Sequence, residues 1–341
     1  MKVYAGMDPR LSIADIVAHA RRVEALGYDG LHIAETVHDS LAVSLLVAER
    51  TERIVVRSAV TLAFTRSPTL TAYAAWDLAK VSDGRFQLGL GTQIRQNIED
   101  RFAMTWSEPV DRMRDYVGAL HALYRSFATG DGVHHEGRHY RLTRLQPYFN
   151  PGPDSSTTPP PTWLGGVNPG MCRLAGELAD GFVTHPTNSD PRYLETVCLP
   201  NLHRGAERAG RDPKEIELVA GTTVVTGATT QELDYERERQ RRLFAFLYST
   251  PAYRRTLALY GWEELGGRLR SLVREDRWDD LGTLVTDEIL DTLVPMGRLD
   301  ELPTLLNRRF GGLADGVLVS PPADATNDAA FAEVVTAIRA G

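Results

Sequence analysis

Short and almost continuous apolar runs alternate along the chain with longer segments in which apolar residues recur at helical spacing. Strands that are apolar on both faces are typical of a parallel sheet covered by helices on each side. The short runs therefore predict eight parallel strands, at Lys2–Gly6, Leu31–Ala34, Ile54–Leu62, Phe86–Gly91, Trp163–Gly165, Gly181–Thr184, Glu217–Thr226 and Gly316–Ser320.

The segments between these runs have the pattern of amphipathic helices. In Ser12–Leu26, for example, the apolar residues fall on one helical face, Ser12 is placed to cap the first turn, and Gly27 is a suitable end. A repeated alternation of strand and helix predicts an α/β fold, a (β/α)8 TIM barrel, with an open doubly wound sheet as the alternative. Further helices are predicted at Leu41–Arg50, Thr69–Val81, Asp111–Ser126, Gly170–Leu178, Tyr193–Ala209 and Leu299–Phe310.

Two segments interrupt this alternation, and we interpret both as insertions in a single barrel domain over residues 1–341. Residues 127–161 combine a Gly-Asp-Gly turn, a short strand-like run and a loop with five prolines within residues 151–161, which indicates an excursion over one end of the barrel. Residues 231–298 are rich in Arg, Glu and aromatic residues and predict extra helices before the last strand. This second insertion could line a substrate pocket, form a subunit contact or simply decorate the surface.

Composition narrows the range of functions. The formal net charge is −7 and no basic stripe is present, so nucleic acid and anionic membranes are disfavoured as partners. The two cysteines, Cys172 and Cys198, lack metal-ligand spacing. No apolar stretch resembles a signal peptide or a membrane span, so we expect a cytoplasmic protein.

Three segments at the expected carboxyl ends of strands have residues suited to chemistry. The fourth strand ends in the small residues Gly89, Gly91 and Thr92. They would let a flat ring approach the backbone, although a tight turn would also explain them. The dinucleotide fingerprint GxGxxG is absent, which disfavours a Rossmann dehydrogenase. A glycine-rich turn into a helix is favourable for phosphate, at Gly165, Gly166, Asn168, Pro169 and Gly170.

The third segment follows the second strand and contains Glu35, His38 and Asp39. An imidazole between two acids at the catalytic rim could transfer a proton, although a loop histidine is more often a surface residue. No metal site is predicted, because the histidines at 134, 135 and 139 lie in an irregular loop without an evident carboxylate partner.

Taken in order, the motifs GYDGLHIAE, TRSP, SDGRFQLGLGT and LAGELADGF resemble the bacterial luciferase-like superfamily, and more narrowly its F420-dependent oxidoreductases. The resemblance implies a TIM barrel with a deazaflavin ring at the carboxyl ends of the strands and its phosphate tail at Gly165–Gly170. It also implies a cis peptide bond in the third strand, at or near Ala59–Val60, and a ring lined by Gly89, Gly91 and Thr92. Our own hypothesis is that Thr61 and Thr92 donate hydrogen bonds to the ring. Two positions depart from the family: Thr36 stands where relatives often have a histidine, and Gln93 where some have a glutamate.

From these residues we expect an F420-dependent enzyme that transfers a hydride to or from an alcohol, a carbonyl compound or an activated alkene. His38 would exchange the proton, with Glu35 or Asp39 orienting it. The alternatives are an FMN-dependent monooxygenase and a non-catalytic protein that binds flavin or deazaflavin. The resemblance also implies a homodimer.

Overall fold

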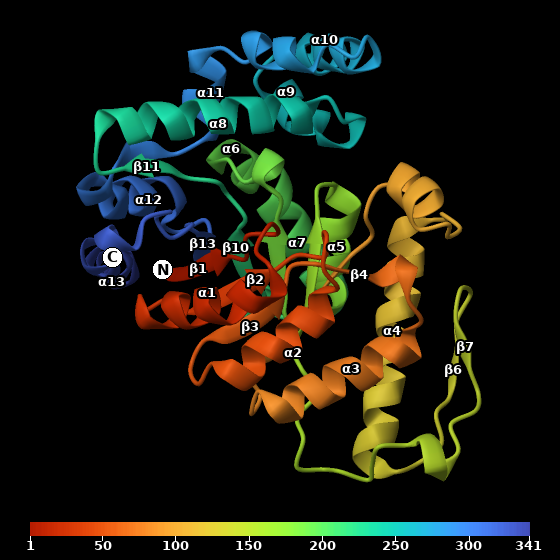
Figure 1. Ribbon diagram of the computed structural model, residues 1–341. Helices are drawn as coiled ribbons and strands as arrows, with labels where there is room; N and C mark the ends of the chain where they lie inside the picture. The colour runs from red at the N-terminus through yellow and green to blue at the C-terminus, as the bar shows by residue number, and fades with distance from the viewer.

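Eight parallel strands close into a barrel in the computed structural model, which describes residues 1–341 (Figure 1). β1 pairs with both β2 and β13, and the ring closes where β3 pairs with β5. The predicted (β/α)8 barrel is therefore confirmed. Its strands are β1 (Lys2–Gly6), β2 (Gly30–Ile33), β3 (Val55–Ser58) with its short continuation β4 (Thr61–Leu62), β5 (Phe86–Gly91), β8 (Thr162–Gly166), β9 (Gly181–Thr184), β10 (Glu217–Ala220) and β13 (Gly316–Leu318).

Helices surround the barrel and bury their apolar faces against it, which gives one large hydrophobic core. Ser12 caps the first helix as predicted, accepting a hydrogen bond from the N–H of Asp15. The outer helices are α1 (Ile13–Ala25), α2 (Ser40–Arg50), α3 (Pro68–Val81), α4 (Pro109–Thr129), α5 (Pro169–Leu178), α6 (Pro191–Tyr193), α7 (Leu199–Arg208), α12 (Leu302–Phe310) and α13 (Asp328–Ala340). None of the helices is both long and apolar enough to span a membrane.

Three details of the predicted elements are wrong. The run Ile54–Leu62 is not one strand, because the backbone breaks between β3 and β4 at Ala59–Val60. The run Glu217–Thr226 also divides, and its second part becomes β11 (Val225–Gly227), which pairs with β12 (Met296–Arg298) in a separate small sheet. Helix α13 was not predicted, although its buried residues Phe331, Val334, Val335 and Ile338 have helical spacing.

A layer of large side chains fills the barrel interior below its carboxyl-terminal mouth. Arg57 is fully buried and lies between two rings, 4.6 Å from the centroid of Tyr4 and 3.3 Å from that of Trp163. Its guanidinium donates hydrogen bonds to Gln87 Oε1 at 2.7 Å and to His32 Nε2 at 2.8 Å. Because burial and the nearby Arg57 hold the pKa of His32 well below its usual range, this imidazole is neutral. The layer closes the barrel beneath the mouth.

The two insertions lie on different sides of the molecule (Figure 1). The first contains the hairpin of β6 (His135–Glu136) and β7 (Arg141–Leu142), which lies beside α4. Asp115 of α4 binds His135 Nε2 at 2.6 Å and so holds the hairpin against this helix. The expectation that the loop histidines lack a carboxylate partner is therefore wrong.

The second insertion forms a layer of helices with a small hydrophobic core of its own, separate from the barrel core. Its neck is the β11–β12 pair, which brings the two ends of the insertion together. The helices are α8 (Thr230–Tyr248), α9 (Arg254–Leu259), α10 (Glu263–Arg274) and α11 (Asp287–Leu293).

Helices α5 and α7 touch through glycines. A Cβ atom on Gly176 would lie 2.0 Å from the carbonyl oxygen of Leu202, and one on Gly205 would lie 2.0 Å from that of Arg173. We expect Gly205→Ala to reduce the free energy of unfolding by about 1–3 kcal/mol, because the helices must separate. Thermal unfolding followed by circular dichroism measures this effect.

The matched control is Gly267→Ala in α10, where an added Cβ meets nothing within 4 Å. This change should be neutral or stabilise the protein by up to ~1 kcal/mol, since alanine favours helix. Equal unfolding temperatures for the two variants would contradict the close α5–α7 contact.

Candidate active site at the barrel mouth

The break in the third strand shapes the mouth of the barrel. The peptide bond between Ala59 and Val60 is cis, at the position that the resemblance implied. Val60 packs directly against two glycines of neighbouring strands: a Cβ atom on Gly91 would lie 2.3 Å from Val60 Cγ2, and one on Gly165 would lie 2.7 Å from Val60 Cγ1. Ala59 and Val60 remain partly exposed. Together they form a small apolar surface at the mouth.

Backbone and hydroxyl hydrogen bonds hold this break on both sides. The N–H of Ala59 donates to the carbonyl of Ile33 at 2.8 Å, and the N–H of Glu35 donates to the carbonyl of Val60 at 3.2 Å. On the other side, Ser58 Oγ accepts from the N–H of Gly89 and donates to its carbonyl, each at 2.9 Å. The interrupted strand therefore stays joined to β2 and β5.

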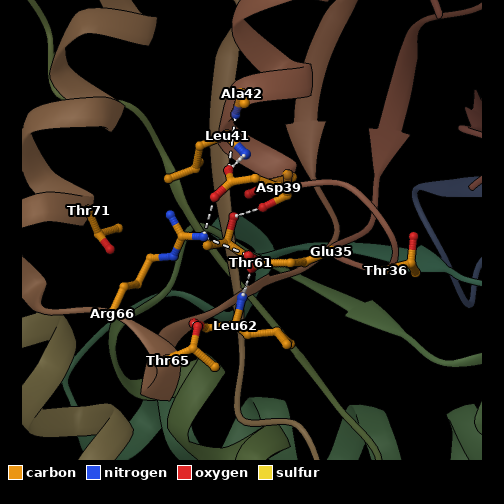
Figure 2. Close-up of polar contacts among 12 residues, drawn as sticks. Glu35, Thr36, Asp39, Leu41, Ala42, Thr61, Leu62, Thr65, Arg66 and Thr71 are labelled. Atoms are coloured by element: carbon orange, nitrogen blue, oxygen red, sulfur yellow. Dashed lines mark hydrogen bonds and ion pairs between the residues drawn. The ribbon is translucent and has the colours of Figure 1, made fainter. Parts of the chain in front are cut away.

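Glu35 and Asp39 both bind Arg66, as Figure 2 shows. Arg66 Nη2 donates to Glu35 Oε1 at 2.6 Å and to Asp39 Oδ2 at 2.8 Å. The other oxygen of Glu35 accepts the N–H of Leu62 at 2.6 Å. Asp39 also caps α2, accepting from the N–H groups of Leu41 and Ala42. Burial tends to raise the pKa of Asp39, but the hydrogen bonds from Arg66 and Ala42 outweigh it and lower the pKa.

His38 does not contact either carboxylate. Its Nε2 lies 3.1 Å from the carbonyl oxygen of Leu11, so Nε2 carries the proton and Nδ1 is the free acceptor. The expectation that Glu35 or Asp39 orients His38 therefore does not hold, because both carboxylates already bind Arg66 and backbone N–H groups. The Leu11 carbonyl takes this orienting role.

Three of the predicted cofactor contacts are buried. Thr61 is fully buried and its hydroxyl lies 2.8 Å from Ser40 Oγ, while Gly89 and Gly91 lie behind the Ala59–Val60 break. The prediction that these residues line the ring is corrected: the glycines make room for the break itself. Thr92 is partly exposed, and its hydroxyl donates to the adjacent carbonyl of Gln93 at 3.0 Å.

The predicted phosphate site lies next to Val60. Gly165 and Gly166 end β8, and Asn168 precedes Pro169, the first residue of α5. No side chain caps this helix, and Asn168 is exposed. Pro169 has no N–H, and the N–H groups of Met171 and Cys172 donate to the carbonyl of Asn168. The N–H of Gly170 therefore has no partner in the protein and is the group at this helix start that could bind an anion.

One residue of the mouth was missed from the sequence. His185 directly follows β9, and its ring stacks on Tyr253 of the second insertion, with centroids 4.6 Å apart. The available signal was a histidine one residue after a predicted strand, at the carboxyl end where barrel sites lie. Its partner could not have been found, because Tyr253 is distant in the chain.

Comparison with known proteins identifies relatives over most of the chain. The family model described as luciferase-like monooxygenase matches residues 3–309. An uncharacterised protein of Mycobacterium tuberculosis is 38% identical over 296 residues, which cover 87% of this chain and 86% of the relative. A 5,10-methylenetetrahydromethanopterin reductase of Archaeoglobus fulgidus is 26% identical over 305 residues, covering 88% and 87% of the two chains.

Solved structures share the fold at low sequence identity. The F420-dependent tetrahydromethanopterin reductase of Methanopyrus kandleri superposes with a TM-score of 0.80 at 19% identity, over 99% of this chain and 98% of that one. A 3,6-diketocamphane monooxygenase component from Pseudomonas putida, in complex with FMN, superposes with a TM-score of 0.66 at 16% identity, over 99% and 96%.

Glu35 should be a structural residue of the mouth. We expect Glu35→Ala to reduce the free energy of unfolding by about 2–3 kcal/mol, because it leaves the N–H of Leu62 without an acceptor and the half-buried Arg66 guanidinium with Asp39 alone. Glu99→Ala, which removes an exposed ion pair with Arg95, should cost less than about 0.5 kcal/mol. Urea unfolding of both variants tests the difference, and equal effects would show that Glu35 does not hold the break.

Proposed function

The chain belongs to the luciferase-like monooxygenase family, whose members are flavin- or F420-dependent oxidoreductases, and on that premise we propose that it uses F420. The reaction is transfer of a hydride between the deazaflavin and a small organic substrate, such as an alcohol, a carbonyl compound or an activated alkene. The observation that carries this proposal is the contact between the apolar surface of Val60 and the start of the Gly165–Gly170 segment.

The residues at the mouth fit such a cofactor. A flat ring needs an apolar support, which Ala59 and Val60 provide, and a phosphate needs a free N–H group, which Gly170 provides at the uncapped start of α5. The F420 ring would supply the carbon that carries the hydride. Gly165, Gly166 and Asn168–Gly170 would hold the phosphate, and Thr92 is available at the rim.

His38 is the proposed group for proton exchange with the substrate. Its Nε2 is held by the carbonyl of Leu11, so Nδ1 is the atom that takes or returns the proton. The protein otherwise positions the reactants and limits access of water. There are two alternative functions. One is an FMN-dependent monooxygenase, and the diketocamphane monooxygenase component, which was solved with FMN, is similar to this chain in fold. The other is a protein that binds the cofactor without catalysis.

The cofactor is tested by titrating the purified protein with F420 and, separately, with FMN, while cofactor fluorescence is followed. We expect tight binding of F420 and weak binding of FMN. Turnover with alcohols, ketones or enones should then proceed without oxygen consumption. Preference for FMN with oxygen uptake would favour the monooxygenase, and binding without turnover would favour a carrier.

The role of His38 is tested with His38→Asn. Turnover should fall by roughly 10²–10⁴-fold, because general acid–base catalysis contributes about that much, while the Kd for F420 stays within a few-fold. His203→Asn, which changes an exposed histidine of α7, is the matched control. Unchanged turnover in the His38 variant would remove this residue from the mechanism.

A further inference from the structure

His185 points toward the barrel mouth. Its backbone is extended, with φ −91° and ψ 153°, and so continues the direction of β9. Side chains alternate between the two faces of a strand. Val183, two residues earlier, packs inside the barrel against Tyr4, Trp163 and Val219. The His185 side chain therefore lies on the interior face, one layer above Val183.

Thr187 sets the tautomer of the His185 ring. Its backbone N–H donates to Nδ1 at 3.4 Å, and its hydroxyl lies 2.9 Å from the same atom. Since Nδ1 accepts, the proton of the neutral imidazole is on Nε2. No group of the protein accepts a hydrogen bond from this Nε2–H.

Three tyrosines of the second insertion hold the loop that follows β9. Tyr253 stacks on His185 with an angle of 10° between the planes. Tyr248 donates from its hydroxyl to the carbonyl of Thr187 at 2.9 Å, and Tyr260 donates to Asp190 Oδ1 at 2.7 Å. The insertion is therefore attached to a loop of the mouth and is not a surface decoration.

The surroundings of His185 keep it uncharged. Burial lowers its pKa to about 4, without a contribution from any charged group. The titratable groups that the insertion packs on this loop are Tyr248, Tyr253 and Tyr260, and burial raises the pKa of all three hydroxyls. Burial also raises the pKa of Asp190 in the loop, although Arg309 of α12 acts on this carboxyl in the opposite direction. At neutral pH the His185 ring is therefore an uncharged hydrogen-bond donor.

We propose that His185 is a second catalytic residue, which donates a hydrogen bond from Nε2–H to the reacting oxygen of an uncharged carbonyl or alcohol substrate, and that Tyr253 positions its ring. This inference rests on the proposed hydride transfer. A carbonyl oxygen gains negative charge when its carbon accepts a hydride, and a fixed N–H donor stabilises that charge. The neutral donor selects ketones and alcohols over carboxylates and phosphates, which would need a cation.

The first test is nuclear magnetic resonance of the full chain with isotope-labelled histidine, using His185→Gln to assign the signal. Without cofactor, we expect a neutral Nε2–H tautomer from pH 5.5 to 8.5. In the F420-loaded protein, cyclohexanone as a probe should shift this signal. A ring that titrates near pH 6.5, or a signal that cyclohexanone does not move while F420 is bound, would overturn the proposal.

Variants separate catalysis from support of the fold. His185→Ala should slow ketone reduction by roughly 10²–10³-fold, as for loss of one donor to a developing oxyanion, while the Kd for F420 changes less than ~3-fold. In Tyr253→Leu, the shift of the His185 signal on addition of cyclohexanone should be at least ~10-fold smaller than in the unchanged protein. In Tyr253→Phe, which keeps the stacked ring, the shift should be close to that of the unchanged protein. Tyr235→Leu changes an exposed tyrosine of the same insertion and is the control.

The outcomes distinguish this inference from the proposed function. If F420 does not bind, hydride transfer fails, yet the tautomer and pKa of His185 in the free protein can still be measured. If F420 binds and ketones are reduced equally well by His185→Ala, only the role of His185 is wrong. Equal loss of F420 binding and turnover in His185→Ala would show a structural residue and would also overturn the proposal.

Discussion

The mouth of this barrel depends on the seating of Val60 against Gly91 and Gly165. A side chain at either glycine would occupy the volume of the Val60 methyl groups, so the break in the third strand and the two glycines require each other. Glu35 holds the far side of the break through its own N–H and through the N–H of Leu62. The apolar surface and the start of the phosphate segment are adjacent because of this packing.

Beneath that surface, the barrel interior is filled by the charged side chain of Arg57 and the aromatic rings around it. The Arg57 guanidinium is fully buried, and the faces of Tyr4 and Trp163 replace part of its hydration through cation–π contacts. Glu217 lies 3.9 Å from it and supplies the opposite charge. A neutral His32 completes the set. This layer fills the barrel interior beneath the small residues and the loops of the mouth.

The second insertion links a peripheral unit to that mouth. Its helices bury a small core of their own, which makes them a stable support independent of the barrel core. Tyrosines 248, 253 and 260 then reach across to the loop of residues 185–190. A rigid unit that fixes the His185 side chain limits the conformational entropy that this side chain would lose on binding a ligand, which is the advantage of preorganisation.

The barrel and most of the outer helices follow from the sequence alone, because periodicity and motif order depend on residues that are close along the chain. Periodicity missed the break in the third strand, which only the family resemblance implied. The sequence could not reveal partners. Glu35 and His38 are neighbours in sequence, yet Glu35 binds Arg66 and His38 binds the Leu11 carbonyl, since the closed ring brings β4 and the first loop beside them. In the same way, only the tertiary structure buries Thr61, turns Gly89 and Gly91 toward the break, and stacks Tyr253 on His185. Contacts of this kind depend on which strands and insertions meet in space, and no local pattern records that.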